Sequence, residues 1–298
     1  MWFVYSIITL LFWGLADLFY KKGAKEEDKY SHLKTGIMVG LVMGIHATGY
    51  ILIKGIDVNL LDLLKYLPVS FFYISSMIIG YKGLKYLELS IASPVQNCSG
   101  VITSLLLFLI FREKLPVLDI IGIGIIAAGI VFLSIVERKD KKITIKKSKI
   151  TFSVITIIFP LIYCILDGMG TFLDAIYLDK LSLITEDAAL IAYEYTFFLY
   201  GLIVFAYLKF KKKERINILE EKDKLVAAIF ETAGQFFYVF AVARNSTIAI
   251  PIISMYSVAS IVFAHLFLKE KLNKKEYITI IIVLIGIIVL GIIEGFHS

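Results

Sequence analysis

The chain has 298 residues, 59% of them hydrophobic, and a formal net charge of +6 at pH 7. Soluble domains are roughly 45–50% apolar, and the mean hydropathy here is +0.84, so a water-soluble domain of useful size is excluded. The basic residues fall in loops between apolar runs, so the charge does not point to nucleic acid as a partner. Cys98 and Cys164 both lie inside apolar runs, which argues against a disulfide framework.

Apolar segments of about 20 residues recur along the chain, each long enough to cross a bilayer core of about 30 Å as a helix. No basic region precedes the first, so we expect a retained helix there and not a signal peptide. The predicted helices cover residues 2–20, 35–53, 66–84, 89–111 and 117–136 in the first half. In the second half they cover 151–178, 188–210, 225–243, 246–268 and 276–293.

An internal duplication relates the two halves. Residues 91–133 and 248–290 align without a gap at a constant offset of 157, with 14 of 43 positions identical. Because each half holds an odd number of helices, the second must enter the membrane from the opposite side. Inverted repeats of this kind are a recurring transporter architecture. The sequence predicts an all-α integral membrane protein of ten transmembrane helices in two inverted five-helix repeats, 1–136 and 151–298, joined by a basic connector at 137–150.

Lysine and arginine are distributed unevenly between the loops. The loops after the first, third, fifth, seventh and ninth predicted helices carry 25 of the 31 basic residues. The positive-inside rule places these loops in the cytoplasm. We therefore predict a multi-pass protein of the cell membrane with both termini outside.

Several short motifs stand in order along the first half. They are Tyr-x-Gly-Leu-x-Tyr at 81–86, Ser-Ile-Ala-Ser-Pro at 90–94, Glu-Lys-Leu at 113–115, and the glycines at 122 and 129. Together with Trp13-Gly14, this series resembles the EamA-type repeat of the drug/metabolite transporter superfamily. The resemblance implies a cavity surrounded by helices one to four and six to nine, with helices five and ten peripheral. Nucleotide-sugar carriers of that superfamily are usually drawn with cytoplasmic termini, whereas our orientation follows the charge count.

The duplicated residues have local structural interpretations. Pro94 and Pro251 each fall near a predicted helix start, where the missing N–H costs little. A bend point for gating is the alternative. Glu113 and Glu270 lie in short basic turns, and we expect them to form local salt bridges or caps.

Three glycines on the second predicted helix are spaced four residues apart, as in helices that pack closely together. Gly36, Gly40 and Gly44 form G-x-x-x-G twice. Small residues at this spacing let helices approach closely, so packing is the expected role. A sliding seam during transport is the alternative.

Four acidic residues lie inside predicted helices, and a charge at bilayer depth costs about 2.5–3.5 kcal/mol. They are Asp17, Asp167, Glu194 and Glu231. Each aspartate follows an aromatic residue by four positions, Trp13 and Tyr163 respectively, which places ring and carboxylate on one helix face. Aromatic faces and carboxylates together suit an organic cation. Asp17 has pairing with Lys21 as its alternative, and Asp174 is expected at the membrane interface.

The two glutamates have polar or aromatic neighbours. Tyr193 and Tyr195 flank Glu194, although neighbours on a helix point in different directions. Glu231 shares a helix face with Gln235 and lies near Tyr238. A carboxylate buried in a low dielectric is able to exchange protons near neutral pH. We therefore predict that Glu231 or Asp167 is such a site.

Polar residues at matching depths of the fourth and ninth predicted helices suggest that both line the cavity, with interhelical hydrogen bonding as the alternative. His46 stands alone in the sequence, so we predict no metal site. The predicted substrate-binding residues are Trp13, Asp17, Gln96, Asn97, Tyr163, Asp167, Tyr193, Glu194, Glu231, Gln235, Tyr238 and Tyr256.

The sequence contains no nucleophile–base set, metal motif or phosphate-binding loop. We therefore predict no enzyme and no cofactor, and transport driven by gradients, because no ATP-binding motif is present. The predicted function is secondary active transport of a small polar or cationic, amine-type metabolite by alternating access, coupled to protons or another ion. Export of neutral amino acids is the alternative, and lipid handling a more remote one. The expected partners are a small-molecule substrate and the bilayer but no nucleic acid, and the chain is expected as a monomer or homodimer.

Overall fold

The computed structural model describes residues 1–25, 27–84, 98–112, 117–140 and 149–269, with a discontinuous set of residues between 272 and 289. All regular elements in these residues are helical. Some predicted features lie outside the described residues: Pro94, Gln96, Asn97, Glu113, Glu270, residues 141–148 of the connector and part of the last predicted helix.

The helices follow the predicted order. In the first half they are α1 (Trp2–Gly23), α2 (Ser31–Lys54), α3 (Leu60–Leu84), α5 (Cys98–Phe111) and α6 (Val117–Asp140). In the second half they are α7 (Lys149–Ala175) with the π-helical turn η1 (Ile176–Lys180), α8 (Glu186–Ala206) with η2 (Tyr207–Lys211), the 3₁₀ turn η3 (Ile218–Glu221), α9 (Lys222–Ile253) and α10 (Tyr256–Leu268). Six helical stretches in the described residues are long and apolar enough to cross a membrane, and shorter apolar helices accompany them. The predicted all-α membrane class is confirmed.

Helix boundaries have local causes. Gly55, with φ 64°, ends α2 in the left-handed conformation that favours glycine. The Thr185 hydroxyl accepts the N–H of Ala188 at 3.3 Å and caps α8. α3 begins six residues before the predicted start at 66, because the Asn59 side chain accepts the Leu61 N–H at 3.0 Å and starts the helix there. Hydropathy alone gave no sign of that cap.

The predicted ninth helix, 246–268, is interrupted. α9 kinks at Asn245, whose φ of −163° and ψ of 80° are not helical and whose side chain accepts the Ile248 N–H at 3.2 Å. The helix then ends at Ile253, two residues after Pro251, and α10 starts at Tyr256. The break predicted between 243 and 246 is therefore present as a kink, and a second break follows inside the predicted helix.

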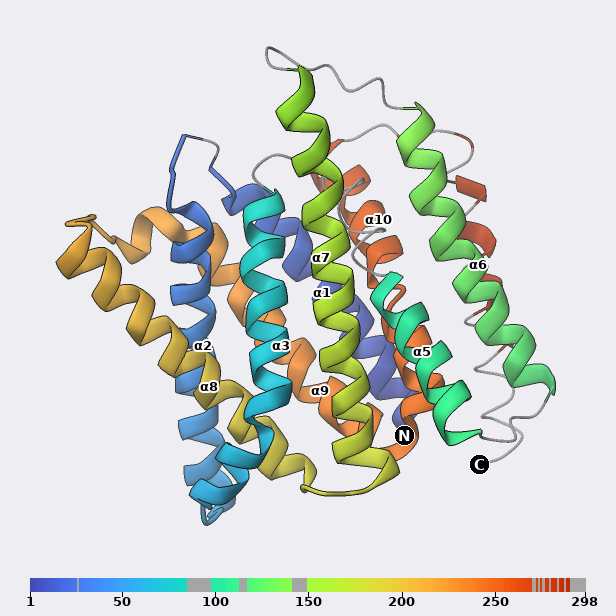
Figure 1. Cartoon of the computed structure of the whole chain (residues 1–298), viewed down its shortest axis with the longest axis horizontal. Coiled ribbons are helices and arrows are strands. Elements are labelled where there is room, and N and C mark those ends of the chain that lie inside the picture. The colour runs from blue at the N-terminus through green and yellow to red at the C-terminus, as the bar shows by residue number, and fades with distance from the viewer. Residues whose placement is uncertain are drawn as a thin grey trace.

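Helices of the two halves pack against each other in related pairs. α1 contacts α9 as α7 contacts α3, α1 contacts α10 as α7 contacts α5, and α2 contacts α9 as α8 contacts α3. α2 and α8 contact one another. If α1, α2, α3 and α5 are exchanged with α7, α8, α9 and α10 respectively, the same set of contacting pairs results. A duplicated architecture predicts this. Figure 1 shows α2 and α8 crossing on one side of the bundle, with α6 on the opposite side.

The crossing of α2 and α8 uses the predicted glycine spacing to bring the two backbones close together. A Cβ on Gly40 would lie 2.5 Å from the Phe197 carbonyl oxygen and 3.1 Å from the Gly201 Cα, both in α8. Gly36 and Gly44 lie against the side chains of Tyr200 and Phe198 in the same helix. α2 and α8 are equivalent helices of the two halves, and they contact each other. Their crossing therefore lies on the two-fold axis that relates the halves.

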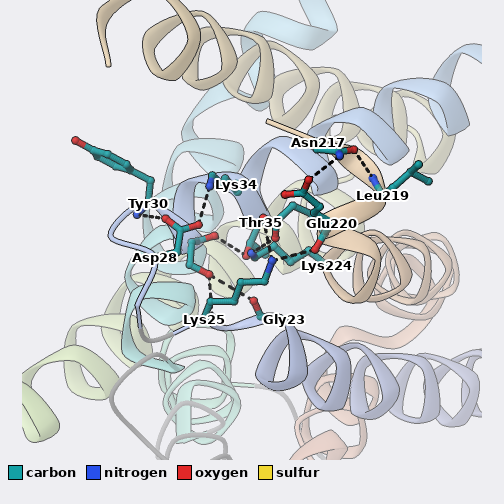
Figure 2. A network of polar contacts seen from close by, with 12 residues as sticks. Gly23, Lys25, Asp28, Tyr30, Lys34, Thr35, Asn217, Leu219, Glu220 and Lys224 are labelled. Carbon is teal, nitrogen blue, oxygen red and sulfur yellow. Dashed lines mark hydrogen bonds and ion pairs between the residues drawn. The ribbon is translucent and has the colours of Figure 1, made fainter. Parts of the chain in front are cut away.

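The loop between α1 and α2 is ordered by Asp28, whose carboxylate accepts the Tyr30 N–H at 2.8 Å and the Lys34 Nζ at 2.8 Å (Figure 2). Partial burial acts to raise the pKa of Asp28, but the hydrogen bonds from Lys34 and Tyr30 outweigh it and lower this pKa below its ordinary value of 3.8. The carboxylate is therefore charged at neutral pH.

This lowered pKa predicts a pH-dependent contribution to stability. A group with a depressed folded-state pKa stabilises the fold above its unfolded pKa and loses that contribution as the pH falls through the folded value. We expect wild type to be more thermostable than Asp28→Asn at pH 7, with a difference that shrinks as the pH falls below about 4. Thermal unfolding of both proteins in detergent across this range measures it, and a difference that does not depend on pH would contradict it.

Candidate functional site

A buried cavity lies at the centre of the bundle, between α1, α3, α7, α8, α9 and α10. It offers about 60 Å³ to the centres of water-sized groups, whereas a single buried water needs about 10–15 Å³ on this measure. The described residues that line it are Trp13, Asp17, Tyr20, Tyr73, Met77, Gly80, Tyr81, Tyr163, Asp167, Thr171, Tyr193, Glu231, Gln235 and Tyr256. Three of these side chains are carboxylates and none is a lysine or arginine, so the described lining is acidic.

The two aspartates are held in the same way by opposite halves. Asp17 on α1 accepts a hydrogen bond from the Ser260 hydroxyl of α10 at 2.9 Å. Asp167 on α7 accepts one from the Ser99 hydroxyl of α5 at 2.7 Å. Since the exchange of halves converts the α1–α10 contact into the α7–α5 contact, these two hydrogen bonds are related by the internal two-fold.

Glu231 breaks that symmetry. It is 5% exposed, and no side-chain hydrogen bond or ion pair to its carboxylate is present among the described residues. At the duplication offset its counterpart in the first half is Ile74. One turn along, the Gln235 amide nitrogen is buried, has no hydrogen-bond partner among the residues that the structure describes, and belongs to the same cavity wall. A buried polar group without a partner costs free energy, so this wall favours a polar ligand.

Aromatic rings surround the carboxylates. Trp13 packs on Tyr238, with ring centroids 5.1 Å apart, and edge-on against Tyr256 at 5.6 Å. Its indole N–H donates to the Glu231 backbone carbonyl at 3.3 Å, and the ring occupies the space beside Gly234. This hydrogen bond and these ring contacts connect α1 to the middle of α9 beside Glu231.

Eight of the twelve predicted substrate-binding residues line the cavity: Trp13, Asp17, Tyr163, Asp167, Tyr193, Glu231, Gln235 and Tyr256. Tyr238 lies directly behind Trp13. Glu194 is not brought to the cavity, and the remaining two residues are outside the described part of the chain.

The resemblance implied that the third predicted helix borders the cavity, but none of its residues was predicted to bind substrate. Tyr73, Met77, Gly80 and Tyr81 all line the cavity. Their spacing of four, seven and eight positions from Tyr73 places them on one helix face. That spacing was the available signal, although Met77 and Gly80 are residues that also suit a packed apolar face.

The sequence profile of the EamA-like transporter family matches residues 1–135 and 154–292. The chain belongs to the EamA-like transporter family. The resemblance inferred from the repeated motifs is thereby confirmed.

Two further likenesses accompany this family membership. Over 77 residues the transporter is 34% identical to YvaE, an uncharacterized membrane protein of Bacillus subtilis strain 168; this segment is 26% of the present chain and 65% of YvaE. The match thus spans less than two thirds of YvaE. A protein of known crystal structure superposes with a TM-score of 0.67 at 13% identity, covering 99% of this chain and 98% of the other, which shows a shared fold.

Two residues of this EamA-like transporter have partners that the sequence analysis did not anticipate. His46 does not stand alone, because its Nδ1 lies 2.8 Å from both carboxylate oxygens of the fully buried Glu194. Asp174, predicted at the membrane interface, is 0% exposed and accepts the Tyr66 hydroxyl at 2.6 Å. In both cases the partner comes from a different helix, which the local sequence does not reveal.

The described residues contain no group of three His, Cys, Asp or Glu side chains that could hold a metal ion. The ligand class is therefore inferred from the carboxylates, the aromatic rings and the Gln235 amide that line the cavity.

Proposed function

We propose that this EamA-like transporter is a secondary active transporter of small organic cations of the amine type. The observation that carries the proposal is the central cavity, where three carboxylates are enclosed by aromatic rings and no basic side chain is present among the described lining residues. Cation–π attraction adds to charge pairing in such a site. A low dielectric strengthens both, because water does not screen them.

The unpartnered groups indicate where a ligand would bind. Glu231 provides a carboxylate that no described side chain engages, and Gln235 provides an amide donor one turn away. A ligand with a positively charged nitrogen and a hydrogen-bond acceptor a few ångströms away would satisfy both. Asp17 and Asp167, each held by a serine hydroxyl, would contribute to the field without changing position.

The same carboxylate suits ion coupling. A proton and an organic cation compete for a single negative charge, so only one of them is bound at Glu231 at a time. Release of the proton on one side and of the substrate on the other then couples the two gradients through alternating access. In this mechanism the protein carries out no chemical reaction and needs no cofactor.

We propose that the protein lies in the cell membrane with the loops at 24–30 and 212–217 in the cytoplasm. The support is the concentration of lysine and arginine in the loops of that set.

Uptake into proteoliposomes tests the proposal. The purified transporter would be given a quaternary ammonium ion, several primary amines and several neutral amino acids, each with and without a pH gradient. We expect saturable movement of at least one organic cation, accelerated by an opposing proton gradient and absent from empty liposomes. Movement of neutral amino acids alone would overturn the proposal in favour of amino acid export, and movement of no compound in the panel would overturn both.

A further inference from the structure

Polar contacts lie on both sides of the central cavity, toward opposite ends of the bundle. We call the end formed by the loop at 24–30 and residues 212–221 the first end, and the end formed by the loops at 55–59 and 181–185 the second end. Figure 1 shows the two at opposite ends, the first at the top and the second at the bottom. Each end contains two layers of polar contacts.

The inner layer at each end is a pair of tyrosines. Toward the first end the Tyr81 hydroxyl donates to the Tyr20 hydroxyl at 3.1 Å, with ring centroids 4.7 Å apart. Toward the second end the hydroxyls of Tyr73 and Tyr238 lie 2.9 Å apart. Tyr81 and Tyr238 differ by 157 positions, which is the offset of the duplication. Equivalent tyrosines of the two halves therefore make these contacts toward opposite ends.

The outer layer at the first end is a cluster of charges. Lys224 is 0% exposed and pairs with the Glu221 carboxylate. The Lys25 ammonium lies 3.2 Å from the same carboxylate and donates to the Glu220 carbonyl at 2.9 Å. Gly23 packs directly against the Lys224 side chain. Figure 2 shows Gly23 and Lys25 beside Glu220 and Lys224, where the end of α1 meets the start of α9.

The outer layer at the second end is a tyrosine–carboxylate contact. Asp174, near the end of α7, accepts the Tyr66 hydroxyl at 2.6 Å and the Tyr73 hydroxyl at 3.4 Å. Tyr66 lies near the start of α3. Exchange of the two halves converts the α1–α9 contact into the α7–α3 contact. The two outer layers therefore occupy equivalent places but differ in chemistry.

We propose that these layers are the two gates of the transporter: an ionic gate of Lys25, Glu221 and Lys224 at the first end, and a tyrosine–carboxylate gate of Tyr66 and Asp174 at the second. The inference rests on alternating access in the proposed function. Separating α1 from α9 opens the ionic gate only, and separating α7 from α3 opens the tyrosine–carboxylate gate only. In this mechanism, a state with both sets of contacts formed is the occluded state.

Thiol labelling tests the gates without any substrate. In a background of Cys98→Ser and Cys164→Ser, Met77→Cys places a thiol on the cavity wall. Its rate of reaction with a membrane-impermeant, positively charged methanethiosulfonate reagent is measured from each side in oriented vesicles. We expect Glu221→Gln to accelerate labelling from the side of the first end, and Tyr66→Phe from the side of the second. A roughly tenfold faster labelling rate corresponds to a shift of about 1.4 kcal/mol in the equilibrium between the closed and the open gate.

Matched controls exist at both ends. Glu220→Gln makes the same chemical change one residue away, at an exposed carboxylate whose oxygen contacts Asn217. Tyr177→Phe changes the ring that packs edge-on against Tyr66. Neither control should alter labelling from either side.

Unchanged labelling in both gate variants, or equal acceleration from both sides, would overturn the gates. Lys25→Gln, at a half-exposed side chain, is the milder variant if Glu221→Gln does not give monodisperse protein. One-sided labelling changes in a protein that moves no organic cation would leave the gates standing and refute the proposed substrate class. The reverse result would refute the gates alone.

Discussion

Replacing Glu231 with glutamine should weaken binding of an organic cation by about thirtyfold or more and abolish its acceleration by a proton gradient. Glutamine keeps the size and the hydrogen-bonding capacity of the side chain but removes the charge and the titrating proton. Removing one partner of a buried charge pair costs about 2–5 kcal/mol, and every 1.4 kcal/mol is about tenfold in affinity. Equilibrium binding of a quaternary ammonium ligand, together with proteoliposome uptake, measures both effects.

Asp17→Asn and Asp167→Asn provide the comparison inside the same cavity. Their amide oxygens still accept the hydrogen bonds from Ser260 and Ser99, so each variant loses field strength but keeps its local structure. We expect these variants to lose less affinity for the cation than Glu231→Gln, and a proton gradient should still accelerate their transport. If Glu231→Gln transports as wild type while Asp167→Asn does not, the coupling role belongs to Asp167.

Much of the architecture was predictable because the sequence contains an internal duplication. The offset of 157 and the odd helix count predicted related halves, and the observed packing pairs are unchanged when the halves are exchanged. The acids and rings of the cavity were predictable for a different reason. A charged side chain in an apolar helix is costly, so Asp17, Asp167 and Glu231 stood out before any neighbour was known.

The partners of those acids were not predictable in the same way. Ser260 and Ser99 are ordinary residues in apolar helices, and only the packing of α10 on α1 and of α5 on α7 brings them to the aspartates. Glu194 shows the limit most clearly. It neighbours the cavity residue Tyr193 in sequence, yet its carboxylate contacts His46. Successive residues on a helix point about 100° apart, so adjacency along the chain did not imply a shared site.

Substituting Gly40 with alanine should destabilise the transporter by about 1–3 kcal/mol, the cost of overpacking a tight contact. The added Cβ would lie 2.5 Å from the Phe197 carbonyl oxygen and 3.1 Å from the Gly201 Cα. Both are backbone atoms, so no side chain is able to rotate away and the two helices have to separate. Because this crossing lies at the centre of the two-fold relation, the separation would disturb both halves. Gly40→Leu should prevent recovery of monodisperse protein.

Gly49→Ala is the matched control on the same helix. A Cβ at Gly49 meets nothing within 4 Å, and alanine favours the helix over glycine by about 1 kcal/mol. We therefore expect this variant to be neutral or slightly more stable. Thermal unfolding in detergent, followed by size-exclusion chromatography, compares the two. Equal destabilisation by both substitutions would show that α2 needs flexibility and not close packing, and would favour the alternative in which the glycines form a seam that slides during transport.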